Sequence, residues 1–344
     1  MIGAVFSKSL IAFLMSLGLT QGGPGPLTVQ CAPTTMAVGW TGSESVSCTI
    51  AGAEDFDGDV GVACAGLPAG AACRVDTPTA HVRPGTTATA TLHVVYDEGV
   101  PAGRSSMQVT ASQGSVSESA TVAVLKNLDT VFRVCPSRAD VAAIDHDLKL
   151  SFESDPTSGT YTCLAANGSR DLTLMQARVY GTLAAARRLS FDAPLPWTRD
   201  PLYKWMIRTI RGIRFRDGIQ NSFCCDPANM INVRAHVEGM PQHGLAIAIT
   251  QSQMMATDSR LLRGFLDLIV HEARHNHGPR HSCPDNTRDQ TIGELGAWGE
   301  AYYTNVWLAD HLDPNLVTPA LREDARRAAA QICAHQLCKG DCPQ

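Results

Sequence analysis

The stretch from His271 to His281 limits the possible folds of this chain more than any other segment. It contains the pattern HExxHxxGxxH. On an α-helix, His271 and His275 lie one turn apart, so both imidazoles project from one face and can bind a single Zn²⁺ ion. Glu272 is rotated by about 100° from that pair and can act as a general base toward a metal-bound water. A positive φ at Gly278 would end the helix and bring His281 back toward the same ion.

The residues before this motif favour the helix that it requires. Asp258 and Ser259 are both suited to the N-cap position. Apolar residues then recur at helical spacing, at Leu262, Phe265, Leu266, Ile269 and Val270. We therefore expect a helix over residues 259–277. The competing interpretation is that its histidines are only buried side chains, or that they hold a structural metal.

The long motif resembles that of the metzincin metallopeptidases, and this resemblance is confined to residues 271–281. It implies that the three histidines of the motif bind zinc and that Glu272 is the base. Metzincins also have a methionine-containing turn beneath the metal, whereas this chain has no methionine after Met255. The resemblance therefore covers the ligands and the base but not the turn.

A second spacing offers another third ligand. Glu294 follows His275 after eighteen residues, which resembles the HExxH-x18-E pattern of gluzincins, the thermolysin-like and aminopeptidase-type enzymes. Residues 291–303 are expected to form the helix that such a glutamate needs. His281 and Glu294 are thus alternative third ligands, and the other one can hydrogen-bond a metal-bound imidazole. Tyr302, two turns after Glu294, is a candidate to stabilise a developing oxyanion, although core packing also explains a tyrosine there.

The N-terminus and the cysteine content indicate export. Residues 1–22 contain Lys8 followed by the apolar run 10–15, which is typical of a secretory signal peptide and too short to span a bilayer. The twelve cysteines are an even number and are expected mostly to form disulfides. We therefore expect a secreted or periplasmic protein without stable membrane insertion. No basic patch with interleaved aromatic residues is present, which excludes a nucleic-acid partner.

Residues 27–125 predict an all-β sandwich, because apolar residues alternate with polar ones between Gly- and Pro-rich turns. The runs 61–73 and 100–103 resemble the Ig-like repeats of secreted bacterial proteins, and this resemblance implies a spacer or stabilising module, with adhesion or carbohydrate binding as the alternative. Cys64 and Cys73 are placed to close one hairpin, which leaves Cys31 paired with Cys48.

The composition changes after a linker expected at 126–134, and residues 135–344 predict an α+β, largely helical domain. Strands before an HExxH helix, followed by a helical half, resemble the zincin layout. Residues 244–249 are a candidate edge strand for pairing with an extended peptide, or else a buried core strand. The expected helices are 139–148, 171–189, 200–210, 259–277, 291–310 and 319–336, and the expected strands are 211–217, 230–237 and 244–250.

Two cysteine positions bear on the metal site. Cys224 and Cys225 are adjacent, and since a disulfide between neighbouring residues is strained and rare, each is expected to bond elsewhere. Cys283 lies two residues after His281. A bridge from Cys283 would hold the loop that carries this ligand, in the place of a methionine turn. The remaining C-terminal cysteines are expected to staple the chain end: Cys333, Cys338 and Cys342.

These features together predict an exported zinc-dependent peptidase, with Zn²⁺ as cofactor and a protein or peptide as substrate. Zinc lowers the pKa of its bound water, Glu272 takes the proton, and the hydroxide attacks the scissile carbonyl. Glu272 then returns the proton to the leaving amine. The alternative is a secreted binding or adhesion protein with a structural or degenerate zinc site. Three protein ligands and an open fourth position favour an enzyme, whereas four protein ligands favour a structural site.

Overall fold

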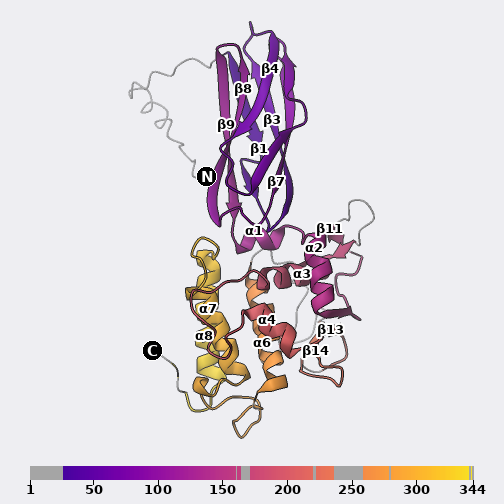
Figure 1. The fold of residues 1–344 in the computed structure, drawn as a ribbon, viewed down its shortest axis with the longest axis vertical. Coiled ribbons are helices and arrows are strands. Elements are labelled where there is room, and N and C mark those ends of the chain that lie inside the picture. The colour runs from indigo at the N-terminus through magenta and orange to yellow at the C-terminus, as the bar shows by residue number, and fades with distance from the viewer. Residues whose placement is uncertain are drawn as a thin grey trace, which may run out of the picture.

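A computed structural model gives the fold in two parts, a β-rich part formed by residues 27–126 and a more helical part after it (Figure 1). The predicted order, β first and largely helical second, is confirmed. The expected signal peptide and the expected strand 244–250 lie outside the described residues. The structure describes residues 26–159, 161–163, 171–219, 222–235, 259–278, 280–340 and 342.

The β-rich part consists of two facing sheets that share one apolar core. The sheet orders are β1-β3-β7-β5 and β2-β9-β8-β4-β6. The predicted alternation is confirmed in β7, where Ala90, Leu92, Val94 and Tyr96 are at most 3% exposed. The strands are β1 (Leu27–Ala32), β2 (Thr35–Ala37), β3 (Gly42–Gly52), β4 (Gly58–Ala65), β5 (Ala71–Val75), β6 (Thr79–Val82), β7 (Thr87–Tyr96), β8 (Gly103–Gln113) and β9 (Val116–Lys126).

The segment expected as a linker contains a helix, α1 (Leu128–Arg133), capped by Asn127. Just before it, the ammonium group of Lys126 is buried and donates to the carbonyl oxygens of Glu98 (3.1 Å) and Val100 (2.7 Å). The backbone N–H of Leu128 donates to a carbonyl near the end of the chain, that of Leu316 (2.9 Å). Lys126 thus ties the start of this segment to the β-rich part, and Leu128 ties the helix to the helical part.

The helical part contains a small parallel sheet of β10 (Lys149–Phe152), β13 (Gly212–Arg216) and β14 (Met230–Arg234). The helix expected at 171–189 begins only at Leu174, because the two preceding residues pair with another strand and Thr173 caps the helix. The other elements are α2 (Arg138–Asp147), β11 (Tyr161–Cys163), β12 (Leu172–Thr173), α3 (Leu174–Ala186), α4 (Leu202–Thr209), α6 (Arg260–His277), the 3-10 helix η1 (Ile292–Glu294), α7 (Ala297–Asp310) and α8 (Pro319–His335).

All twelve cysteines form disulfides. The expected bonds Cys31–Cys48 and Cys64–Cys73 are present, but the second one joins β4 to β5 in the facing sheet rather than closing a hairpin. The expectation for Cys224 and Cys225 is wrong, since they bond to each other. No other cysteine is left to bond to them, because the remaining six pair as Cys135–Cys163, Cys283–Cys338 and Cys333–Cys342. Six disulfides indicate an oxidising compartment.

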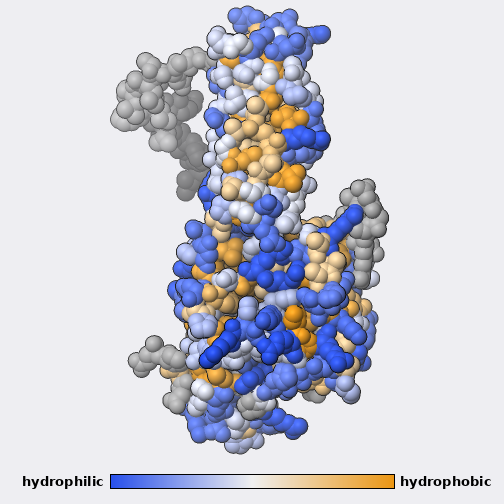
Figure 2. Space-filling model, in the orientation of Figure 1, coloured by the Kyte–Doolittle hydropathy of each residue, from blue (hydrophilic) through white to orange (hydrophobic). Residues whose placement is uncertain are grey.

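The surface drawn in Figure 2 is mainly polar, with apolar residues gathered in the middle of the β-rich part. Among the described residues, Val95 and Phe223 are the large apolar side chains that are most exposed, at 56% and 40%. Within the same residues, no helix combines the length and the apolar character that crossing a membrane requires.

Candidate metal centre

Helix α6 presents the first two histidines of the motif. The predicted apolar stripe is buried against the core, because its five residues are at most 2% exposed. Ser259 precedes the helix without capping it by its side chain, and its backbone N–H instead donates to the Asp129 carboxylate (2.7 Å). Burial of the stripe fixes the rotation of the helix about its axis. This in turn fixes the side on which His271 and His275 lie.

His271, His275 and His281 converge on one point. One ring nitrogen of each lies within 4.8 Å of the corresponding atoms of the other two. The ring centroids are 5.1 Å apart for His271 and His275, 5.5 Å for His271 and His281, and 4.8 Å for His275 and His281. The structure therefore brings together the three histidines of the motif in a group that could hold a metal ion.

The two helical histidines are neutral at pH 7. Burial, followed by the neighbouring imidazoles, holds the pKa of His271 well below its ordinary value, and the Ala297 carbonyl opposes this to a smaller extent. Burial, followed by His281, lowers the pKa of His275 to about 4, with Asp289 acting in the opposite direction. A neutral imidazole keeps a lone pair for a metal ion, so these rings are prepared for coordination.

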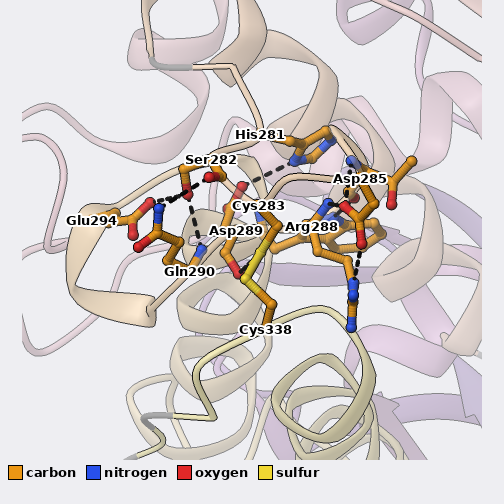
Figure 3. The surroundings of a disulfide bond; sticks show 11 residues. His281, Ser282, Cys283, Asp285, Arg288, Asp289, Gln290, Glu294 and Cys338 are labelled. Carbon is orange, nitrogen blue, oxygen red and sulfur yellow. Dashed lines mark hydrogen bonds and ion pairs between the residues drawn. A yellow bond between two sulfur atoms is a disulfide. The ribbon is translucent and has the colours of Figure 1, made fainter.

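Asp289 holds the third histidine of the group. Its Oδ1 atom lies 2.9 Å from Nδ1 of His281, and the residue is only 1% exposed (Figure 3). A carboxylate only accepts hydrogen bonds, so the ring donates from Nδ1, and in a neutral imidazole the lone pair is then on Nε2. This is the tautomer that can bind a metal through Nε2.

Trp298, near the start of α7, forms an apolar wall beside the histidines. Its ring centroid lies 4.1 Å from that of His271 and 6.1 Å from that of His281. The indole N–H donates to the carbonyl oxygen of Thr287 (2.9 Å), and the residue is 7% exposed. The indole thus restricts the positions of two of the three imidazoles.

Gly278 ends α6, but not by the predicted positive φ. Its φ is −119° and its ψ is 178°, an extended conformation open to any residue. The reason for glycine here is space, because a Cβ atom would stand 2.3 Å from Nε of Arg274. That guanidinium lies 3.2 Å from the buried carboxylate of Glu300 on α7. Glycine therefore leaves room for the contact between Arg274 and Glu300 that links the end of α6 to α7.

The alternative third ligand, Glu294, is not part of the three-histidine group. It lies in η1, and Leu295 follows with a φ of 51°, so the continuous helix expected over 291–303 is broken. The Glu294 carboxylate accepts a hydrogen bond from the Ser282 hydroxyl, on the side of Ser282 away from His281 (Figure 3). Ser282 is also fixed by the backbone N–H of Gln290, which donates to its hydroxyl (2.9 Å).

Tyr302 packs against a small apolar cluster of α7 and α8 that includes Trp298 and Ile332. Its ring also meets Tyr303 edge-on, with centroids 5.3 Å apart. These contacts fit the core-packing interpretation of this tyrosine. Its catalytic role stays a prediction.

Glu272 is a buried acid next to the first histidine. It is 7% exposed, and burial raises its pKa to about 7, while the backbone of Cys224 acts in the opposite direction. A carboxyl group with this pKa is about half ionised at neutral pH. It can therefore both accept and release a proton under ordinary conditions.

The donor set suits a transition metal. Three imidazole nitrogens are typical ligands of Zn²⁺, and also of copper, iron and nickel ions, so the group does not select one of them. The described residues supply three ligands within one cluster and no fourth His, Cys, Asp or Glu. An ion held by these three nitrogens would keep a position for water or substrate.

Comparisons with known proteins give no assignment. No family model matches the chain, and no curated protein matches it. Among solved structures, a FixG-related protein from Vibrio parahaemolyticus is 11% identical, with 30% of this chain and 96% of that chain covered and a TM-score of 0.25. The Escherichia coli chaperone DraB is 15% identical, covering 28% of this chain and 54% of that one, with a TM-score of 0.20. A native α-2-macroglobulin fragment from Escherichia coli is 10% identical, covering 91% and 48%, with a TM-score of 0.22. Similarity at this level supports no conclusion on fold or function.

Two residues of the site were missed by the sequence analysis, Asp289 and Trp298. Glu294 was the carboxylate expected to hydrogen-bond an imidazole if it was not itself a ligand, whereas the structure gives that contact to Asp289. Three acids follow the motif within a short stretch, Asp285, Asp289 and Glu294, and their spacing does not rank them. Only the path of the chain after Gly278 brings Asp289 to His281.

Proposed function

We propose that this protein is an exported metallopeptidase in which His271, His275 and His281 bind a catalytic Zn²⁺ ion and Glu272 is the general base. One observation carries the proposal: three imidazoles converge in one group, and Glu272, directly after the first of them on α6, is a buried acid whose pKa is raised to about 7. A bound divalent ion would polarise the scissile carbonyl and acidify a water molecule. The fold expected for this activity is a zincin-like domain, here behind an Ig-like β-sandwich.

The histidines, Asp289 and Glu272 would each have a separate role in this mechanism. The three histidines would bind the ion, His271 and His275 through rings whose pKa is lowered by burial, and Asp289 orients His281. Glu272 takes a proton from the attacking water and returns it to the leaving amine, for which a pKa of about 7 is well matched. The lack of a fourth His, Cys, Asp or Glu in the described cluster favours catalysis over a purely structural metal.

The six disulfides support export, for which residues 1–22 would be the signal peptide. The substrate would be a protein or peptide. The β-rich part suits a stabilising role, because Arg188 on the helical side donates to its Glu98 carboxylate (2.8 Å).

The test combines metal analysis with digestion of casein or a peptide library, with and without a chelator. Glu272→Gln should keep the metal and lower turnover by about 10²-fold or more, since the base is lost and the ligands are not. Glu294→Gln is the matched control, because a carboxylate that only accepts from Ser282 should not change metal content. A metal-free wild-type protein, or wild-type turnover by Glu272→Gln, would refute the proposal.

A further inference from the structure

The carboxylate of Asp289 accepts hydrogen bonds from both the His281 ring and the first turn of α7. Its Oδ1 atom accepts from Nδ1 of His281 (2.9 Å). Its Oδ2 atom accepts from the backbone N–H groups of Trp298 (2.8 Å) and Gly299 (3.4 Å), in the first turn of α7. The N-cap residue of that helix, Gly296, offers no side chain, so Asp289 caps α7 from a distance.

The backbone of Asp289 is itself held in place. Its N–H donates to the carbonyl oxygen of Gln336 (3.1 Å), and its carbonyl accepts from the N–H of Cys338 (3.0 Å). Cys338 bonds to Cys283, two residues after His281 (Figure 3). The residue that orients this imidazole is therefore fixed at its main chain as well as at its side chain.

The chain also leaves space for this carboxylate. A Cβ atom on Gly296 would stand 2.5 Å from Oδ2 and 2.7 Å from Cγ of Asp289. The φ of Gly296 is −73°, which any residue adopts, so conformational freedom does not explain the glycine. Its missing side chain instead makes room for the hydrogen bonds of Asp289 to the helix.

We propose that Asp289 is a positioning residue that couples metal affinity to the start of α7. One oxygen fixes the tautomer and direction of the His281 ring. The other fixes the helix start that carries Trp298, whose indole packs on His271. One buried carboxylate thus sets the geometry of two ligands without touching the ion. This inference rests on the metal site of the proposed function.

The first test separates orientation of the ligand from capping of the helix. In Asp289→Asn, the amide oxygen can still accept from the α7 backbone, but the amide N–H₂ faces Nδ1 of His281. The ring must then accept at Nδ1 and carry its proton at Nε2, where the ion would bind. We expect a Zn²⁺ affinity about 10- to 100-fold lower than wild type, with little change in the melting temperature of the metal-free protein. Affinity is measured by competition with a chromophoric chelator.

The second test changes no ligand and no hydrogen-bonding side chain. Gly296→Ala should displace the Asp289 carboxylate and lower Zn²⁺ affinity. Gly293→Ala is the matched control three residues away, because its Cβ would have Thr291 Oγ1 as nearest neighbour, at 3.9 Å. We expect the control to bind Zn²⁺ as wild type does.

Wild-type affinity in both Asp289→Asn and Gly296→Ala would overturn the inference while leaving the proposed function intact. Equal losses in Gly296→Ala and Gly293→Ala would also overturn it, since the effect would then not come from Asp289. If Asp289→Asn fails to fold, the two glycine variants decide alone. A wild-type protein that binds no Zn²⁺ would overturn this inference and the proposed function together.

Discussion

The disulfide Cys283–Cys338 should stabilise the fold and the metal site separately, and these two effects can be measured apart. The bond ties the loop after His281 to the end of α8. The change to make is the double substitution Cys283→Ser and Cys338→Ser, so that no free thiol is left. The matched control is Cys333→Ser with Cys342→Ser, which opens a bond in the same C-terminal region but away from the His281 loop.

The loop lengths give the expected size of the first effect. The bond Cys283–Cys338 spans 55 residues. Loop closure in the unfolded chain then corresponds to about 4 kcal/mol of stability. The control bond spans 9 residues, for which the same relation gives about 2.5 kcal/mol. Both variants should therefore lose stability without metal, with the larger loss in the first.

Only the first variant should lose affinity for the ion. A ligand at 100 times its Kd stabilises a folded protein by about 2.7 kcal/mol, and each tenfold loss of affinity removes about 1.4 kcal/mol of that gain. Urea unfolding with and without Zn²⁺ gives this increment for each variant, and metal analysis gives the occupancy. An unchanged increment and unchanged metal content in the Cys283/Cys338 variant would refute the idea that this bond holds the ligand loop.

Two further predictions concern pH. For the proposed peptidase, kcat/KM for peptide hydrolysis should rise with pH up to about 7. Burial raises the pKa of Glu272 to about 7, and only the carboxylate form accepts a proton. A pH–rate profile that instead rises near pH 4.5, the ordinary glutamate pKa, would contradict this. Burial also raises the pKa of Glu300 from 4.5 to about 8 against the effect of Arg274. The folded state then keeps a proton that the unfolded state releases, so stability should fall as pH rises from about 4.5 to 8. Glu300→Gln should flatten that fall in urea unfolding at pH 5 and pH 8, and an unchanged pH dependence would show that another group causes it.

The parts of the fold that the sequence predicted are those with a local signal. The alternation in β7 and the apolar stripe of α6 each follow from a repeat along one segment, and burial confirms both. The helix at 128–133 was missed because its cause is partly tertiary. Asn127 caps this helix in the structure, but nothing local predicts that Lys126 is buried on the carbonyls of Glu98 and Val100.

The difference between local and tertiary causes also explains which site residues the sequence predicted. The spacing of His271, Glu272 and His275 is set within one helix, so the sequence was sufficient for that part. Asp289 and Trp298 reach the histidines only through the loop after α6 and the start of α7, a path that no short spacing encodes. The contacts of Asp289 and Trp298 with the histidines can therefore be found only in the three-dimensional structure.

Gly278 and Leu295 show why spacing alone left the third ligand open. The glycine of the motif was expected to provide a positive φ, but its backbone is extended and its missing Cβ admits Arg274. The left-handed residue is instead Leu295, directly after Glu294, where it interrupts the helix that a gluzincin-like glutamate would need. Both competing patterns assumed a backbone that this chain does not adopt. Glu294 accepts a hydrogen bond from Ser282, and His281 is fixed by Asp289. For Glu294 to replace His281 as the third ligand, its carboxylate would have to leave that hydrogen bond and the His281 ring would have to leave the three-histidine group. Loss of metal in Glu294→Gln with retention in His281→Ala would be required to restore it.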